Sequence, residues 1–266
     1  MSLVRDLTYP AVVLAARASF KVLDLTIDVR GAEHIPRAGG AVLALNHISY
    51  VDFILGGFSA QQSKRLVRFM AKRELFTHRA AGPLMRSLHH IEVDRGDGLK
   101  SYAEAIRYLQ AGEVVGIFPE ATISRAMELK EFKSGAPRLA AEVGVPLVPA
   151  VLWGTQRMLT KDHPRDFSRG HHVTITVGEP LHPTAARPVD ETAQLKSAMA
   201  ALLDETILHY PEKPEGQWWA PASYGGTAPT LEEASRLDAV EKRERAKAFV
   251  AKERQKRAKA AVRKKQ

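Results

Sequence analysis

Cysteine is absent from this 266-residue chain. Its absence excludes a disulfide framework, a thiolate metal site and a cysteine nucleophile. The composition is otherwise ordinary for a globular protein, because 45% of the residues are hydrophobic. The chain is therefore long and apolar enough to bury a large core, as one large domain or two smaller ones.

A long uninterrupted apolar segment is also missing. Residues 7–27 are rich in Leu, Val and Ala, but Arg17, Lys21 and Asp24 interrupt them. A bilayer-spanning helix needs roughly 20 predominantly apolar residues, so we do not expect one here. No cleavage site of the Ala-x-Ala kind follows the apolar run, which argues against a secretory signal. Two interpretations remain: an amphipathic helix that lies on a membrane, or one that packs on the domain.

Excess positive charge is confined to the C-terminal end. The chain has a formal net charge of +9. Residues 241–266 carry 12 Lys or Arg and three Glu, which accounts for all of that excess. Residues 1–240 are balanced, with 27 basic and 27 acidic residues. The basic character therefore belongs to a tail and not to an active-site cleft.

Short β-rich runs alternate with helix-like segments along most of the chain. We expect strands at 25–29, 41–45, 66–70, 90–93, 114–118, 147–152 and 172–177, and helices at 50–60, 74–87, 99–111, 132–143 and 191–209. This alternation is typical of an α/β layer fold, and continuously apolar strands indicate burial on both faces. The predicted fold is a single α/β domain with a central, largely parallel or mixed sheet flanked by helices.

The composition changes after this domain. Residues 211–229 are rich in Pro and Gly and predict an irregular linker. Within it, Trp218 and Trp219 either anchor the linker to the core or meet a membrane interface.

A basic helix is expected to follow the linker. Thr230 and Glu233 have the spacing of a capping box, and nearly every later residue is a good helix former. The helix is either solvated or attracted to anionic lipid. Nucleic-acid binding is not expected, because the tail lacks a set of aromatic residues for stacking and any recognisable module. The chain thus divides into an N-terminal amphipathic helical segment (1–24), the α/β domain (25–210), the linker (211–229) and the basic C-terminal helix (230–266).

The stretch LALNHISYVDF joins two apolar runs through polar residues that a core does not need. His47 is expected at the turn after strand 41–45, where α/β folds commonly place functional groups, with Asp52 in the next helix. A neutral imidazole can take a proton from an alcohol, and a carboxylate on its other nitrogen stabilises the imidazolium. The spacing leaves an alternative. Ser49 and Asp52 would form a capping box, while Asn46 and His47 satisfy turn backbone groups.

Basic and polar residues follow other predicted strands. They are Lys72 and Arg73 in FMAKRELF, Arg95 in VDRGDG, and Glu120, Thr122 and Arg125 in GIFPEATISR. Each has a surface or turn explanation of its own. Together they place basic and polar groups at the ends of several strands, which suits an anionic substrate head group.

The other histidines do not predict a metal site. His89 and His90 are adjacent, as are His171 and His172, and adjacent residues of a strand point to opposite faces. None has a helical partner four residues away with a carboxylate beside it, so no metal is expected.

In order and spacing, these stretches resemble four blocks of the glycerolipid acyltransferases, particularly the 1-acylglycerol-3-phosphate acyltransferases. NHISYVDF resembles the Asn-His-x4-Asp block, AKRELF and VDRGDG the second, FPEATISR the third and VPLVPA the fourth. The resemblance covers about residues 30–180. A lone His-x4-Asp is a weak signal, whereas four blocks in order are specific.

The resemblance implies acyl transfer from acyl-CoA or acyl carrier protein to the sn-2 hydroxyl of 1-acyl-sn-glycerol 3-phosphate, which forms phosphatidate without a cofactor. His47 is the implied general base, oriented by Asp52. Lys72 and Arg95 are the implied ligands of the acceptor's phosphate. The implied partners are the donor, the lysophospholipid and an anionic membrane, with peripheral attachment at the cytoplasmic face of the cell membrane. The oligomeric state is left open.

Glu120, Thr122 and Arg125 are the further substrate-binding candidates, and a backbone N–H of their turn is expected to stabilise the oxyanion. Here the chain departs from the family pattern, because Glu-Gly-Thr-Arg is replaced by Glu-Ala-Thr-Ile. Ala121 lacks glycine's access to positive φ, and Ile123 lacks a guanidinium. Arg125, two residues on, is the candidate replacement. Another lysophospholipid or glycolipid acceptor is therefore an alternative, as is a catalytically silent lipid-binding protein.

Overall fold

The structure is a computed structural model that describes residues 8–94, 96 and 98–263. The strands are β1 (Thr26–Arg30), β2 (Ala41–Leu45), β3 (Val67–Lys72), β4 (Ile91–Val93), β5 (Val114–Ile117), β6 (Leu147–Trp153) and β7 (His172–Val177). They form one sheet in the order β1–β7–β6–β2–β5–β3–β4. Among the described strands every pairing is parallel except that of β6 with β7. The expected α/β fold with a largely parallel sheet is confirmed, and each predicted strand is present.

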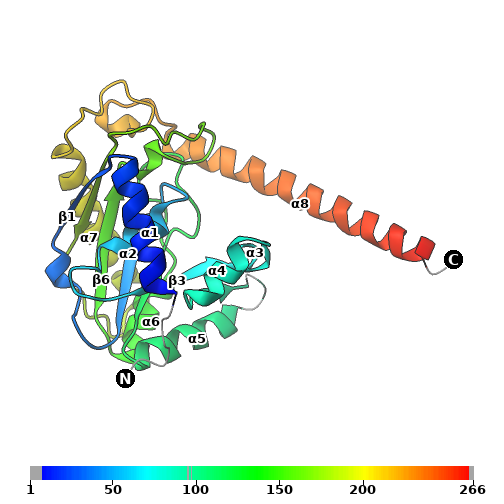
Figure 1. Ribbon diagram of the computed structural model, residues 1–266, viewed down its shortest axis with the longest axis horizontal. Helices are drawn as coiled ribbons and strands as arrows, with labels where there is room; N and C mark the ends of the chain where they lie inside the picture. The colour runs from blue at the N-terminus through cyan, green and yellow to red at the C-terminus, as the bar shows by residue number, and fades with distance from the viewer. Residues whose placement is uncertain (1–7, 95, 97, 264–266) are drawn as a thin grey trace.

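Helices cover both faces of the sheet (Figure 1). They are α1 (Tyr9–Val22), α2 (Asp52–Phe58), α3 (Arg73–Thr77), α4 (Ala81–Ser87), α5 (Gly98–Gln110), α6 (Gly135–Val143), α7 (Pro188–Leu208) and α8 (Leu231–Arg263). Short 3-10 turns lie at Ala32–His34, Thr155–Arg157 and Ala222–Tyr224.

The single helix predicted at 74–87 is wrong, because two short helices, α3 and α4, occupy this stretch. Pro83 has no amide hydrogen and cannot continue the hydrogen-bond ladder of α3. His78 stabilises the new start, since its Nδ1 accepts the N–H groups of Ala80 and Ala81 at 3.3 and 3.2 Å.

The sheet separates two apolar clusters. The strand β2 is buried along its whole length, with Val42 and Ala44 in the cluster that also holds residues of α5, α6 and α7. Leu43 and Leu45 belong to the opposite cluster, which includes Leu55 of α2 and is flanked by α1. Alternating side chains of one strand thus serve both layers, as expected for a strand covered on both faces.

The helix α1 packs one face on the domain, and this packing leaves Leu14 and Val22 exposed on the helix. Phe20 contacts Phe58 of α2 with ring centroids 4.8 Å apart. The hydroxyl of Tyr9 donates to the carbonyl of Val67 in β3 at 3.0 Å. Across the residues that the structure describes, no helix has both the length and the hydrophobicity to cross a bilayer.

The linker returns the chain to the core before α8 leaves it. Trp219 is buried and Trp218 stacks on His163 with ring centroids 3.9 Å apart, so the core-anchoring interpretation is confirmed. The capping box is also confirmed: Thr230 N–H donates to Glu233 Oε2 at 2.9 Å, and Glu233 N–H donates to Thr230 Oγ1 at 3.3 Å. From there α8 extends away from the body of the molecule (Figure 1). The boundaries of the four predicted segments remain a proposal.

Candidate active site

The candidate residues lie at the edge of the sheet where β2, β3, β5 and β6 end. These strands run in the same direction, so their carboxyl ends lie at one edge. His47 follows β2 by two residues, Glu120 follows β5 by three, and Thr155 follows β6 by two. The fold therefore brings together residues that are more than 100 positions apart in the chain.

His47 and Asp52 are hydrogen-bonded. His47 Nδ1 lies 2.9 Å from Asp52 Oδ2. The side chain of Asp52 is fully buried, whereas that of His47 is 21% exposed. Because Nδ1 faces the carboxylate, Nε2 is the ring nitrogen left to accept a proton from a substrate. This geometry is that of a general base held by an orienting carboxylate.

Asp52 also organises the turn around it. Its Oδ2 accepts the N–H groups of Ile48 at 2.8 Å and Ser49 at 2.7 Å, and its Oδ1 accepts the hydroxyl of Thr155 at 2.7 Å. The capping role and the orienting role, which the spacing presents as alternatives, are therefore performed by the same carboxylate. Four donors hold Asp52 in one position, so the imidazole bound to it is held as well.

Asn46 has the backbone role that the alternative assigns to it. Its side chain donates to the carbonyl of Leu152 at 3.0 Å and accepts the N–H of Leu152 at 2.7 Å. These two hydrogen bonds extend the contact between β2 and β6 by one residue beyond Leu45, the last residue of β2 with a backbone partner in β6. Asn46 thereby fixes the direction in which the chain enters His47.

Glu120 holds the backbone of His47. Its Oε1 accepts the His47 N–H at 2.8 Å, and its Oε2 accepts the Lys130 N–H at 3.1 Å. Burial raises the pKa of Glu120 to about 8, against these two N–H bonds, which favour the ionised form. The His47 ring also stacks on Phe118, with centroids 4.3 Å apart. Glu120 thus holds the backbone of the His47 turn, and Phe118 packs against one face of the His47 ring.

The departure from the family pattern has a structural counterpart. Ala121 adopts a left-handed conformation with φ of 60°, which glycine adopts without strain. Its N–H donates to the carbonyl of Phe118 at 3.0 Å, so this amide serves the turn and not an oxyanion. Ile123 is buried, and its apolar side chain fills space where the family pattern has a guanidinium.

Arg125 does not lie open to a substrate. Its Nε contacts Asp162, its Nη1 contacts Asp238, and its Nη2 contacts Glu241 at 2.9 Å. The side chain is 7% exposed. In this arrangement Arg125 is therefore not available to bind a substrate in place of the missing arginine, because each of its guanidinium nitrogens contacts a carboxylate. Two of those carboxylates belong to α8.

The remaining candidates have different positions. Thr122 accepts a hydrogen bond from Lys130 Nζ at 2.7 Å, next to the Arg125 cluster. Lys72 is the exposed last residue of β3, at the same edge of the sheet as His47. Arg73 pairs with Asp94 at 2.5 Å. Arg95 lies outside the described residues.

Four residues that contribute to this region do not stand out in the sequence: Phe118, Lys130, Thr155 and Lys161. Gly154 is the one local signal for Thr155, because its φ of 94° marks a turn directly after β6. A Cβ at Gly154 would lie 2.1 Å from the His172 carbonyl oxygen, so only glycine fits there. No group of three metal-ligating side chains is present in the described part of the chain.

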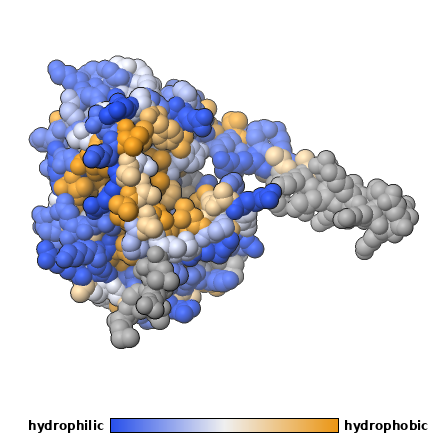
Figure 2. Space-filling view, in the orientation of Figure 1, coloured by the Kyte–Doolittle hydropathy of each residue, from blue (hydrophilic) through white to orange (hydrophobic). Residues whose placement is uncertain are grey.

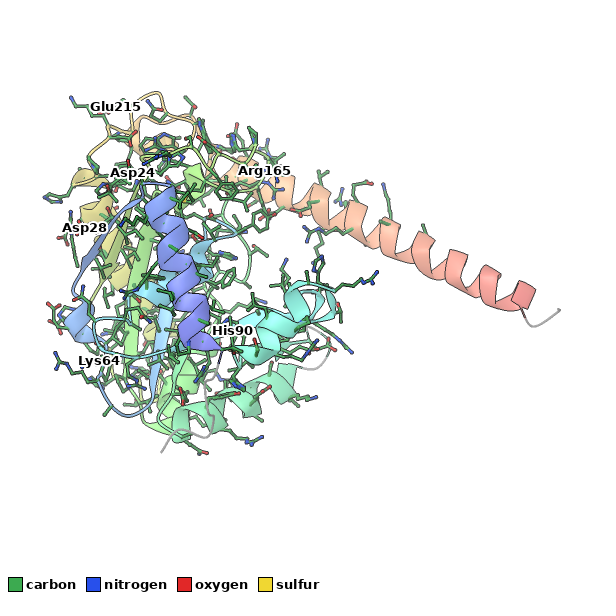
Figure 3. All side chains as sticks on the ribbon, viewed as in Figure 1. Asp24, Asp28, Lys64, His90, Arg165 and Glu215 are labelled. Carbon is green, nitrogen blue, oxygen red and sulfur yellow. The ribbon has the colours of Figure 1, made fainter. Side chains whose placement is uncertain are left out.

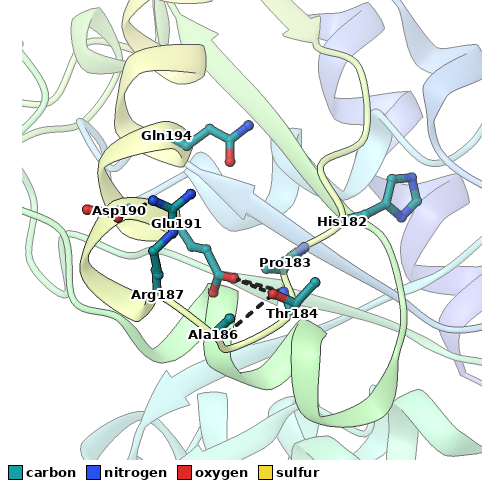
Figure 4. A pocket seen from close by; sticks show the side chains of 8 residues that line it. All are labelled: His182, Pro183, Thr184, Ala186, Arg187, Asp190, Glu191 and Gln194. Atoms are coloured by element: carbon teal, nitrogen blue, oxygen red, sulfur yellow. Dashed lines mark hydrogen bonds and ion pairs between the residues drawn. The ribbon is translucent and has the colours of Figure 1, made fainter.

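A separate hollow lies at the opposite end of the sheet (Figure 4). It is lined by His182, Pro183, Thr184, Ala186, Arg187, Asp190, Glu191 and Gln194. Leu181 bridges to Leu147 at the start of β6, whereas the His47 site lies beyond the end of that strand. The hollow is therefore not part of the candidate active site.

Comparisons with known proteins show the family to which the chain belongs. A family model described as Acyltransferase matches residues 26–153, which include β1 through β6. The 1-acyl-sn-glycerol-3-phosphate acyltransferase of Bacillus subtilis (strain 168) is 31% identical over 182 residues, covering 68% of this chain and 86% of that protein. The 1-acyl-sn-glycerol-3-phosphate acyltransferase alpha of Mus musculus is 31% identical over 183 residues, 67% of this chain and 63% of that protein.

A solved structure has the same fold. The crystal structure of the 1-acyl-sn-glycerophosphate (LPA) acyltransferase from Thermotoga maritima matches with a TM-score of 0.64 at 23% identity. The match covers 76% of this chain and 81% of that chain. The helix α8 lies beyond the residues that the family model matches.

Proposed function

This chain belongs to the acyltransferase family that includes the 1-acyl-sn-glycerol-3-phosphate acyltransferases, and we propose that it acylates the sn-2 hydroxyl of 1-acyl-sn-glycerol 3-phosphate. The acyl donor is acyl-CoA or acyl carrier protein, and the product is phosphatidate. The observation that carries the proposal is the 2.9 Å bond from His47 Nδ1 to Asp52 Oδ2, with the imidazole partly exposed.

The proposed reaction needs a base and no covalent enzyme intermediate. Nε2 of His47 takes the proton of the acceptor hydroxyl as its oxygen attacks the thioester carbonyl. The tetrahedral intermediate collapses, the carbon–sulfur bond breaks, and the imidazolium returns its proton to the leaving thiolate. The buried charge of Asp52 stabilises the imidazolium between these two transfers.

Replacing His47 tests this mechanism. His47→Ala removes the base, and we expect the rate of thiol release from acyl-CoA with lysophosphatidate to fall by roughly 10²- to 10⁴-fold. The matched control is His182→Ala, an exposed histidine of the distant hollow, which is expected to keep the wild-type rate. Equal rates for His47→Ala and wild type would show that His47 is not the base, and no rate above background in wild type would favour a silent lipid-binding protein.

The acceptor is tested separately, because Ile123 replaces the arginine of the family pattern. Purified protein is offered lysophosphatidate in competition with other lysophospholipids and with a phosphate-free monoacylglycerol. We expect lysophosphatidate to be acylated fastest. A faster rate with the phosphate-free acceptor would overturn the phosphatidate assignment and leave the acyl-transfer mechanism intact.

We further propose peripheral attachment to an anionic membrane at the cytoplasmic face. Apolar side chains gather over α1 in Figure 2, where Leu14 and Val22 are 69% and 71% exposed. Such residues favour an interfacial position for a helix that also carries Arg17 and Lys21. Leu14→Glu is expected to reduce sedimentation with phosphatidylglycerol vesicles at least severalfold, while the exposed Leu208→Glu of α7 is the control. Unchanged sedimentation of Leu14→Glu would remove α1 from the membrane contact.

A further inference from the structure

Three basic side chains converge beside the His47 site. Arg125 and Lys130 follow β5, and Lys161 follows β6. Their side chains are 7%, 20% and 10% exposed, so all three charges are largely removed from water. Buried cations need compensating negative charge, because desolvation without a partner is costly. We refer to these three residues as the cationic triad.

The compensating charge comes mainly from α8. Asp238 contacts all three members of the triad, at 2.5 Å to Lys130 Nζ and 3.1 Å to Lys161 Nζ, with Arg125 Nη1 on its Oδ1. Glu241, one helical turn on, reaches Arg125 at 2.9 Å and Lys161 at 3.1 Å. The third carboxylate, Asp162, belongs to the domain itself and contacts Arg125.

The contact between the cationic triad and α8 lies next to the residues that hold His47 in place. Lys130 donates its backbone N–H to Glu120, and the same carboxylate accepts the backbone N–H of His47. The Nζ of Lys130 bonds both Thr122 and Asp238. Two residues, Lys130 and Glu120, therefore connect Asp238 of α8 to His47, the proposed general base.

We propose that the cationic triad of Arg125, Lys130 and Lys161 is a binding site for a substrate phosphate group, and that Asp238 and Glu241 of α8 occupy it when no phosphate is bound. The inference rests on the proposed function for the identity of the substrate. In this site, three basic residues from two loops take the place of the arginine that the family pattern has at the position of Ile123.

The charges favour exchange of α8 for a phosphate. Three cations face three carboxylates in the present arrangement, and withdrawal of α8 leaves Asp162 alone against the triad. The resulting excess of two positive charges matches a phosphate monoester, which carries about 1.5 to 2 negative charges at neutral pH. Asp238 and Glu241 are 23% and 24% exposed, so water reaches both carboxylates in the present arrangement.

The distal half of α8 provides the competing attraction. Residues 242–263 of this helix carry 10 Lys or Arg against two Glu, and α8 extends away from the domain (Figure 1). An anionic membrane attracts such a segment. A surface that holds both the lysophosphatidate and the tail therefore favours removal of α8 from the triad.

The first test neutralises the α8 carboxylates. In Asp238→Asn/Glu241→Gln, we expect the Kd for glycerol 3-phosphate and the KM for lysophosphatidate to fall about tenfold, the factor expected when about one tenth of wild-type molecules are open. The control is Glu232→Gln/Glu244→Gln, which removes two exposed charges of α8 that pair with Arg236 and Lys247 within the helix. Lower thermal stability with unchanged Kd and KM would show that the contact only anchors α8.

A second test removes a member of the triad. Lys161→Met is introduced into the Asp238→Asn/Glu241→Gln background, where α8 no longer needs it. We expect the Kd for glycerol 3-phosphate to rise severalfold, by loss of one charge-assisted contact. In the same background, Lys196→Met removes a partly exposed lysine paired with Glu131; this control is expected to leave the Kd unchanged. Equal Kd values for the two lysine variants would overturn the site.

A third test needs no change in the triad. Because the chain has no cysteine, Ala248→Cys in α8 and Ser197→Cys in α7 allow two spin labels to be attached selectively. Addition of glycerol 3-phosphate is expected to replace the single interlabel distance with a broad, longer distribution. Sodium chloride at the same ionic strength serves as the control for salt screening. An unchanged distance at saturating glycerol 3-phosphate would refute exchange of α8 for phosphate.

Together, these measurements show whether the phosphate comes from the acceptor or the donor. They also test the phosphate site independently of the proposed acyltransferase function. A change in the KM for lysophosphatidate alone assigns the triad to the acceptor, and a change in the KM for acyl-CoA alone assigns it to the donor. Glycerol 3-phosphate binding that depends on the triad, in a protein without transferase activity, would keep the site and reject the proposed function. Transferase activity without triad-dependent binding would do the reverse.

Discussion

His47 follows the C-terminal end of β2 in the interior of the sheet, whereas His90 precedes β4, the edge strand of the same sheet, and their surroundings suit them to different tasks. His47 has a carboxylate on Nδ1 and a partly exposed ring. His90 precedes β4, near the N-terminal end of α1 (Figure 3), and is buried. Its Nδ1 accepts the N–H of Phe69 at 3.1 Å, and the ring of Tyr9 lies 6.4 Å away.

The difference shows what an imidazole needs to act as a base. Protonation of His47 produces a cation beside the charge of Asp52, which stabilises it. Protonation of His90 would place a second cation near Arg68 and break the bond from Phe69. Burial, Arg68 and His89 together lower the pKa of His90 to about 4. His90 is thus a neutral structural acceptor, and His47 is the histidine equipped to gain and return a proton.

The largest expected effect comes from making the His47 region resemble the His90 region. Asp52→Asn removes the charge but keeps an oxygen for the N–H groups of Ile48 and Ser49, while the hydroxyl of Thr155 can accept from the new amide. We expect kcat to fall by roughly 10²- to 10⁴-fold, because the imidazolium loses its counter-charge. Circular dichroism and initial rates measure fold and activity on the same sample.

The control for Asp52→Asn is Asp190→Asn, an exposed residue of the distant hollow. It is expected to leave kcat and the fold unchanged. A folded Asp52→Asn protein with wild-type kcat would show that the carboxylate only caps the turn.

The local pattern of the sequence predicts this region well, for a physical reason. The strand Ala41–Leu45 and the turn after it are encoded by contiguous residues, and His47 and Asp52 are five positions apart. Four parallel strands then bring the polar residues after them to one edge, so the order of the blocks suffices to assemble the site.

The contacts that sequence reasoning misses are formed by residues distant in the chain. The partners of Arg125 in α8 are 113 and 116 positions away, and nothing in the local pattern indicates that acidic residues of a basic tail return to the domain. Thr155 reaches Asp52 across 103 positions. Hydrophobic periodicity predicts which faces are buried, but the pairing of polar side chains depends on the assembled loops.

The second effect concerns stability and not rate. Between pH 6.5 and 4 the unfolded chain protonates His90, whereas the folded chain keeps it neutral. The unfolded state therefore binds more protons, and the free energy of unfolding falls as the pH falls through this window, by up to about 3 kcal/mol. Urea unfolding at pH 7, 5.5 and 4 measures the slope.

His90→Asn isolates this contribution. An asparagine oxygen can accept the Phe69 N–H without titrating, so the variant is expected to lose stability less steeply than wild type below pH 6.5. His182→Asn at the exposed hollow is the matched control and should retain the wild-type slope. Identical slopes for His90→Asn and wild type would mean that His90 does not resist protonation in the folded state.

The smallest effect tests how firmly the base must be held. Thr155→Val keeps the shape of the side chain but removes the 2.7 Å bond to Asp52 Oδ1. We expect the free energy of unfolding to fall by about 1–3 kcal/mol, because a buried carboxylate oxygen loses its donor. Thr176→Val removes a buried hydroxyl contact to Thr206, away from the site, and is expected to cost similar stability with unchanged kcat. If Thr155 positions His47 through Asp52, only Thr155→Val lowers kcat, severalfold and at constant KM. Equal kcat values in both variants would show that Thr155 contributes to stability alone.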